Sequence, residues 1–142
     1  MERELQNLID ILYSEQCSCV IGGDRGPVVC RQRGVRDLLD ILHADSSLLS
    51  GAVVADKVVG KGAAALMVLG GVHLVYAGVI SRKALDLLNA ESVPVRYGEC
   101  VPDIVNRSGT GVCPVEELCA DCHTAIECLP LIEQFVNSMN RL

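Results

Sequence analysis

The chain has 142 residues, of which 50% are hydrophobic and 21% are charged, and this balance is typical of one folded domain. Its formal net charge is −6, and an acidic chain with few aromatic residues to stack on bases is a poor candidate for nucleic-acid binding. No run of about 18 to 20 apolar residues is present, so we expect no membrane-spanning helix. The N-terminus is charged and lacks an apolar signal segment, so we expect a cytoplasmic protein whose eight cysteines are reduced thiols or metal ligands.

The first third of the sequence predicts two helices and a hairpin. Apolar residues at helical spacing predict a helix over residues 2–14. Two short apolar runs, 17–21 and 28–30, flank a turn rich in Gly, Asp and Pro, which predicts a β-hairpin. A second helix is expected over residues 35–42, followed by a loop over residues 44–51.

The rest of the sequence predicts alternating strands and helices. We expect a short strand at residues 52–55 and then a helix over 57–69, with Asp56 as its N-cap. Strands at 73–80 and 93–97 are joined by a predicted helix, so they should be parallel. Ser81 is expected to be the N-cap of a helix over 82–89, and residues 98–112 are expected to form a loop. A short helix should start at Pro114. A last helix should run from a capping box formed by Thr124 and Glu127 to about Met139, with a kink at Pro130.

This order of elements predicts an α/β fold, a three-layer α-β-α sandwich with a small mixed sheet. We expect one domain over residues 1–142, with a core at 14–108 and a helical, cysteine-rich C-terminal segment at 109–142. The high apolar fraction is also compatible with a homodimer.

A segment with two lysines and two glycines, residues 55–62, suggests an anion site. On the predicted helix, Lys57 and Lys61 are four residues apart and share one face. Two cations near a helix N-terminus oppose the helix dipole, so they call for an anion such as phosphate or carboxylate. Gly60 would let that anion approach the backbone. The competing interpretation is structural: Asp56 only caps the helix, the lysines are solvated and the glycines allow close packing.

A second polar segment, residues 106–116, leads into the start of a predicted helix. Arg107 within it can bind an anion with two parallel hydrogen bonds. Cys113 at a helix start would have a lowered pKa, which suits a nucleophile. A buried structural thiol is the more ordinary explanation of this cysteine.

The C-terminal segment carries four cysteines in the pattern C-x5-C-x2-C-x5-C. A C-x-x-C pair can begin a zinc or iron–sulfur site, but the second close pair that such sites usually have is missing. On a helix, Cys119 and Cys122 would also share a face as ordinary core thiols. Metal binding by Cys113, Cys119, Cys122 and Cys128 therefore stays a weaker alternative.

Taken together, these segments resemble a bacterial family, domain of unknown function 1893. The resemblance runs from about Cys17 to the end of the chain, and the family implies a cytidine-deaminase-like fold. It is carried by the run Ala55-Asp56-Lys57-Val58-Val59-Gly60-Lys61, by Val75-Tyr76-Ala77 with Ser81, and by Asn106-Arg107, Gly109-Thr110-Gly111 and Cys113-Pro114 with Glu116.

The resemblance also raises the question of a catalytic zinc. Deaminases of that fold carry His-x-Glu or Cys-x-Glu at the start of one helix and Pro-Cys-x-x-Cys at the start of the next. By order of elements, these positions fall on residues 56–58 and 80–84, where no Cys, His or Glu stands. Zinc is therefore not expected there and no other cofactor is predicted, but the pocket between the two helix N-termini is expected to persist.

Three functional hypotheses follow. The first is a zinc-free pocket that binds a small anion of the nucleotide or sugar-phosphate type. The second is a metal-independent enzyme, with Asp56 as base or Lys57 as a lowered-pKa amine, and Cys113 as nucleophile. The third is a metal-binding or interaction role of the C-terminal cysteines. The ligand-binding residues of the first hypothesis are Lys57, Gly60, Lys61, Ser81, Asn106, Arg107 and Glu116.

Overall fold

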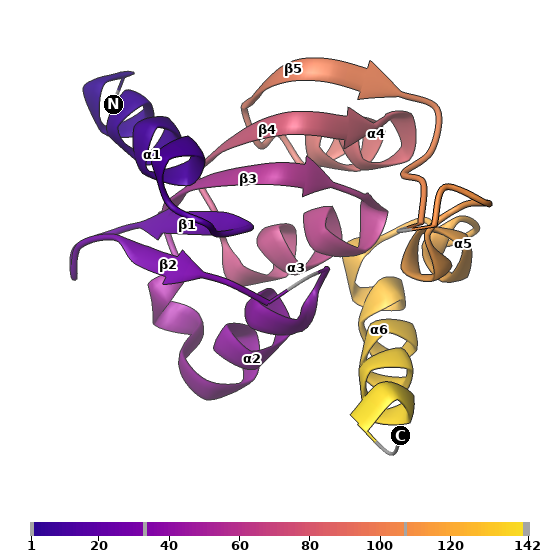
Figure 1. Cartoon of the computed structure of the whole chain (residues 1–142). Helices are drawn as coiled ribbons and strands as arrows, with labels where there is room; N and C mark the ends of the chain where they lie inside the picture. Colours follow the sequence, from indigo (N-terminus) through magenta and orange to yellow (C-terminus); the bar gives the residue numbers. More distant parts are fainter. Residues whose placement is uncertain (1, 33, 107, 141–142) are drawn as a thin grey trace.

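The computed structural model describes residues 2–32, 34–106 and 108–140. Helices and strands follow one another much as the sequence predicts, around one five-stranded sheet (Figure 1). The helices are α1 (Glu2–Ser14), α2 (Arg36–Asp45), the short 3-10 helix η1 (Ser46–Leu48), α3 (Lys61–Gly70), α4 (Arg82–Ala90), α5 (Pro114–Cys119) and α6 (Ala125–Asn140), and the strands are β1 (Cys19–Gly22), β2 (Val28–Cys30), β3 (Val53–Val59), β4 (Leu74–Ser81) and β5 (Val95–Val101).

The sheet is mixed, with strand order β2-β1-β3-β4-β5. The predicted hairpin is confirmed, because β1 pairs antiparallel with β2, and it also pairs antiparallel with β3. Strands β3, β4 and β5 run parallel to one another, which confirms the predicted parallel pair. The starts of α3 and α4 therefore lie at the same end of the sheet, after the C-terminal ends of β3 and β4.

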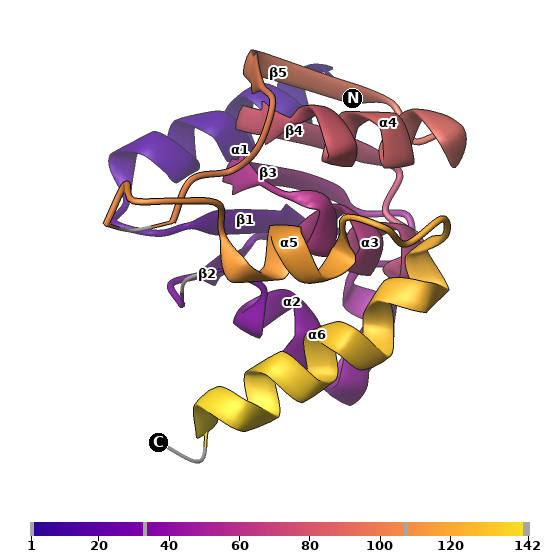
Figure 2. The ribbon, with the colours of Figure 1, turned by 90° about the vertical axis from the view of Figure 1, so that its right-hand side faces the viewer.

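Helices cover the two faces of the sheet unequally (Figures 1 and 2). On one face, α1 packs Leu5, Leu8 and Leu12 against the sheet. On the other face lies the main core, with α3 at its centre between the sheet and the helices α2, α5 and α6. Helix α3 is apolar on nearly all sides because neighbours surround it. The architecture is the predicted α/β fold, consistent with a three-layer sandwich.

The largest departure from the predicted elements is the boundary between β3 and α3. The strand does not end at Ala55 but continues to Val59, because Val58 and Val59 pair with Val79 and Ile80 of β4. Helix α3 begins only at Lys61, and its N-cap is Gly60. The prediction that Asp56 caps this helix is therefore wrong.

Smaller differences concern β5 and α6. Strand β5 extends to Val101, beyond the predicted end, because it pairs with β4 along that length. The Thr124–Glu127 pair behaves as a helix cap, since the Glu127 N–H donates to Thr124 Oγ1 and the Glu127 carboxylate accepts from the His123 N–H. Among the helices that the structure describes, none has both the length and the apolar character needed to cross a membrane.

Candidate active or binding site: the Glu116 cradle and its groove

A buried carboxylate occupies the end of the sheet where the anion site was predicted. The side chain of Glu116 is only 1% exposed. Its Oε1 accepts hydrogen bonds from the Lys61 backbone N–H at 2.8 Å and from Ser81 Oγ at 3.0 Å. Its Oε2 accepts from the Ile104 N–H at 2.7 Å. These donors offset the cost of burying a charge, and we call Gly60, Lys61, Ser81, Ile104 and Glu116 the Glu116 cradle.

The cradle joins the starts of two helices. Lys61 is the first residue of α3, and Ser81 is the N-cap of α4, where its Oγ accepts from the Ala84 N–H at 3.1 Å. Helix N-termini carry free N–H groups and a partial positive charge, which favours an anion. Gly60 packs closely against the cradle, since a Cβ there would lie 3.3 Å from Ile104 Cγ1, a tight contact, and at an ordinary contact distance of 3.5 Å from Glu116 Oε1. The negative charge between the two helix starts is thus the chain's own.

The Lys61 side chain is not available to a ligand in the way that the sequence predicts, but is buried against the end of α5. The residue is 7% exposed, and its Nζ donates to the carbonyl oxygens of Ala120 at 3.2 Å and Cys122 at 2.5 Å. These carbonyls follow the C-terminal end of α5, where helix carbonyls lack partners within the helix. Lys61 therefore fastens both ends of α5 to the start of α3, through its backbone N–H at Glu116 and its ammonium group at the following turn.

Asp56 and Lys57 lie on β3 rather than on a helix, so the prediction that Lys57 and Lys61 share a helix face is wrong. Neighbouring strand residues point to opposite faces of the sheet. Lys57 lies on the α1 side, with its Nζ 6.0 Å from the centre of the Tyr13 ring. Asp56 is 7% exposed and pairs in register with Cys19 of β1.

Burial dominates the electrostatics of Asp56. It raises the pKa of this carboxyl to about 7, although hydrogen bonds from the N–H groups of Val58 and Lys57 favour the charged form. The Asp56 Oδ1 accepts from the Val58 N–H at 3.2 Å. Apart from the backbone N–H of Lys57, which donates to the Asp56 carboxyl, no hydrogen bond or ion pair joins Asp56, Lys57 and Cys113 to one another in the described part of the chain. Their side chains are therefore not assembled into one catalytic group.

The polar loop before α5 is held by its own hydrogen bonds. The Asn106 Oδ1 accepts from the Thr110 N–H and from Ser108 Oγ, both at 3.1 Å. Gly109 has a φ of 71°, a left-handed conformation that glycine adopts readily. The Asn106 side chain is thus committed to the loop, and Arg107, the predicted anion ligand next to it, lies outside the described residues.

The predicted cysteine tetrad does not assemble into a metal site. Cys113 is the N-cap of α5, whereas Cys119 is its last residue. Over residues 2–32, 34–106 and 108–140, no group of three or more His, Cys, Asp or Glu side chains is arranged to hold a metal ion. The alternative of metal binding by Cys113, Cys119, Cys122 and Cys128 is therefore not supported.

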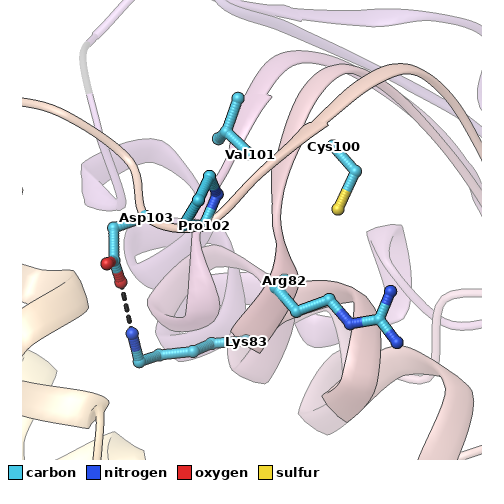
Figure 3. A pocket seen from close by; sticks show the side chains of 6 residues that line it. All are labelled: Arg82, Lys83, Cys100, Val101, Pro102 and Asp103. Atoms are coloured by element: carbon cyan, nitrogen blue, oxygen red, sulfur yellow. Dashed lines mark hydrogen bonds and ion pairs between the residues drawn. The ribbon is translucent and has the colours of Figure 1, made fainter.

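A groove of about 520 Å³ lies beside the cradle, between the start of α4 and the end of β5 (Figure 3). In Figure 3 the side chains of Arg82 and Lys83 leave α4 in different directions. Lys83 forms an ion pair with Asp103, and Arg82 Nε lies 3.2 Å from Asp86 Oδ1. The groove is lined by Arg82, Lys83, Cys100, Val101, Pro102 and Asp103.

The groove and the cradle are neighbours along the chain at two points, because Ser81 precedes Arg82 and Ile104 follows Asp103. Arg82 and Lys83 are not among the predicted ligand-binding residues, although the sequence carries a signal for them. Two cations in the first turn of α4 oppose the helix dipole, which is the same argument that drew attention to Lys57 and Lys61.

The chain was compared with known proteins in three ways. No curated protein matches it. A crystal structure of a DUF1893 family protein (TM1506) from Thermotoga maritima has the same fold, with a TM-score of 0.87 and 24% sequence identity over 94% of this chain and 90% of the other. The profile of the family described as domain of unknown function (DUF1893) matches residues 7–136. The expected likeness to cytidine deaminases stays a prediction, whereas the resemblance drawn from the sequence is confirmed: the chain belongs to the DUF1893 family.

Proposed function

We propose that this protein binds a small anionic molecule in the groove beside the Glu116 cradle. The observation that carries the proposal is the groove itself, which Arg82 and Lys83 in the first turn of α4 line from two directions. Arg82 and Lys83 would contact the negative group of the ligand, and the dipole of α4 would add to their attraction. The groove volume of about 520 Å³ falls within the range of small-molecule sites.

The cradle is not the ligand site in this proposal, because Glu116 already fills it. Three hydrogen bonds satisfy the Glu116 carboxylate, and a second anion beside it would meet like-charge repulsion. The cradle instead sets the positions of Ser81 and Ile104, which flank the groove. The anion site that we propose therefore lies not between the two helix starts but in the groove between the start of α4 and the end of β5.

The lining of the groove indicates what kind of anion fits. Val101, Pro102 and Cys100 offer apolar surface opposite the cationic side chains. A ligand with one phosphate and a flat or apolar body, such as a nucleoside monophosphate, would use both parts. Asp103 competes for Lys83 through their ion pair, so the ligand phosphate has to replace a carboxylate as partner of this ammonium group.

Thermal-shift and calorimetric titrations test the proposal with four probes: inorganic phosphate, ribose 5-phosphate, adenosine monophosphate and uncharged adenosine. A ligand at 100 times its Kd stabilises the protein by about 2.7 kcal/mol, which raises the Tm of a domain of this size by several degrees. We expect at least one phosphate compound to bind, and adenosine not to bind.

A double variant with Arg82→Gln and Lys83→Gln should lose this binding. Lys57→Gln is the matched control, because it removes one lysine from the opposite face of the sheet and should leave binding unchanged. The proposal is refuted if none of the phosphate compounds binds the wild-type protein, or if the double variant binds them as well as the Lys57→Gln protein does.

A further inference from the structure

A second groove, of about 390 Å³, lies at the end of the sheet opposite to the Glu116 cradle. It is formed where α3 passes into β4 and where α4 passes into β5, so the C-terminal ends of both helices border it. Val68 and Gly71 line it from the end of α3, and Glu91 and Ser92 line it from the end of α4. Among the described residues, none lines both grooves.

The charges around this second groove are of the kind that attract a cation. The C-terminal end of a helix carries partial negative charge on its last carbonyl groups, and two helices end here. The Glu91 carboxylate is exposed and takes part in none of the ion pairs that the described residues form. In the described lining no Lys or Arg balances this charge, and His73 is the one basic residue.

The backbone at Ser92 is strained in a way that the equivalent position of α3 avoids. Both helices end in the same motif, in which an N–H group past the helix donates to a carbonyl five residues earlier, at 3.1 Å from Val72 and at 2.9 Å from Val93. The residue before each valine is left-handed, with a φ of 83° at Gly71 and of 59° at Ser92. Glycine adopts this conformation readily, whereas serine adopts it only at a cost.

The strained serine brings a hydroxyl group to the groove that glycine would not supply. Ser92 follows Glu91 directly, and both residues line the groove. A hydroxyl oxygen and a carboxylate both accept hydrogen bonds from an ammonium group, and the bond to the carboxylate is the stronger one because it is charge-assisted. The end of α4 therefore offers one neutral and one charged acceptor side by side.

We propose that this second groove binds a small organic cation, an aliphatic amine. Its ammonium group donates to the Glu91 carboxylate and to Ser92 Oγ, and the C-terminal ends of α3 and α4 add to the attraction. Val68 and Val93 supply apolar surface for the methylene chain. The volume of about 390 Å³ falls within the range of small-molecule sites. This site lies at the other end of α4 from the anion groove and does not depend on it.

Titrations of the full chain with 1,4-diaminobutane test the proposal, with 1,4-butanediol as an uncharged match of the same length. At constant ionic strength, we expect the NMR amide signals of Val68, Gly71, Glu91 and Ser92 to move with the diamine and not with the diol. The double variant with Arg82→Gln and Lys83→Gln should bind the diamine as the wild type does, so this result is independent of phosphate binding.

Two variants separate binding from folding. Ser92→Gly should raise the Tm by about 2 to 4 °C, because it relieves the strained backbone. The same variant should weaken the affinity for the diamine about two- to tenfold, because the hydroxyl acceptor is lost. Glu91→Gln should weaken the affinity about fivefold. The matched control is Glu117→Gln, which removes an exposed carboxylate far from this groove and should leave binding unchanged.

Calorimetric titration of the diamine into each variant gives the affinities, and a thermal melt gives the Tm. The proposal is overturned if the diamine moves no signal of this groove in the wild type, or if the diol moves the same signals equally. It is also overturned if Glu91→Gln binds the diamine as tightly as Glu117→Gln does, or if Ser92→Gly gains stability without losing affinity.

Discussion

The Glu116 carboxylate accepts the backbone N–H of Lys61, fifty-five residues earlier in the chain, at 2.8 Å. The same carboxylate oxygen accepts from Ser81 Oγ. One internal anion thereby ties the start of α3, the start of α4 and the short helix α5 to one another. From the sequence, the two helix N-termini are expected to bind a separate anion. In the structure they bind the carboxylate of Glu116, which holds the C-terminal segment on the core.

The first prediction concerns the cradle. Glu116→Ala should lower the free energy of unfolding by about 3 to 5 kcal/mol, because three buried donors lose their charged partner. Glu116→Gln should cost less, but it still places an amide N–H₂ among donors that need acceptors. Urea unfolding measures both, and the exposed neighbour Glu117 supplies the control, since Glu117→Ala should change stability by less than about 0.5 kcal/mol. Equal losses at residues 116 and 117 would contradict the role of the cradle.

The second prediction concerns Lys61, which the sequence pairs with Lys57 and the structure separates from it. Lys61→Met should destabilise the protein by roughly 1 to 3 kcal/mol, because two carbonyls after α5 lose a charged donor. Lys57→Met, on the α1 side of the sheet, should change stability by no more than about 0.5 kcal/mol. Denaturant unfolding of the two variants decides the matter, and indistinguishable midpoints would show that the contacts of Lys61 contribute little.

The third prediction is a pH dependence that arises from Asp56. Burial raises the pKa of Asp56 from 3.8 to about 7, so the folded state favours the protonated form. The stabilisation from this group is full below about pH 4 and is lost as pH rises through 7. A shift of about three pKa units corresponds to roughly 4 kcal/mol.

Asp56→Asn checks this dependence, because an amide keeps the acceptor for the Val58 N–H and cannot ionise. Relative to wild type, this variant should gain stability between pH 5 and pH 8, as urea unfolding at the two values would reveal. The exposed Asp40 offers the comparison, since Asp40→Asn should follow the wild-type profile. Parallel pH profiles for wild type and Asp56→Asn would contradict a buried carboxyl with a raised pKa.

The fourth prediction concerns the ion pair in the groove. Asp103→Asn frees Lys83 from its carboxylate partner, so the affinity for a phosphate ligand should rise about two- to fivefold, the range expected of a partly exposed ion pair. Lys83→Gln should lower the affinity by a similar factor, and both effects should shrink as salt is raised. Titration calorimetry at two ionic strengths measures them; weaker binding by Asp103→Asn would show that Asp103 assists the ligand rather than competing with it.

Much of the fold follows from local patterns in the sequence. The hairpin, the helices α1, α2 and α4, and the parallel strands β4 and β5 each carry their own periodicity or turn residues. The boundary between β3 and α3 carries no such signal, because the polar pair Asp56-Lys57 inside the strand resembles the N-cap and first turn of a helix. Only the pairing of Val58 and Val59 with β4, a contact distant in sequence, extends the strand.

The polar pair also disturbs the strand itself. Residues 53–56 are all buried, Val58 is 48% exposed and the adjacent Val59 is fully buried, so burial along β3 does not alternate. The exposed Val58 donates its N–H to the Asp56 side chain. Neither feature can be predicted from the alternation of apolar and polar residues that identifies a strand in a sequence.

The sequence indicates which end of the sheet carries the candidate site, but it does not indicate that a carboxylate of the chain itself fills the space between the helix starts. The sequence predicts an anion site between helix starts at Asp56 and Ser81, whereas the first helix begins after Gly60. It also predicts a ligand-binding role for Glu116. Its role as the anion itself depends on contacts with residues 55 and 35 positions away, which no local pattern records. Glu116 from the C-terminal segment therefore occupies the position between the helix starts that the sequence around residue 60 suggests for a bound anion.

An NMR titration shows whether a small anion binds in the groove between α4 and β5. The amide signals of isotope-labelled wild-type protein would be followed while inorganic phosphate, ribose 5-phosphate and adenosine monophosphate are added in separate titrations. We expect the signals that move to belong to the groove, at Arg82, Lys83, Val101 and Asp103, while those of Tyr13, Lys57 and Tyr76 on the opposite face stay in place. Shifts confined to the Tyr13–Lys57–Tyr76 surface, or no shifts at all, would contradict it.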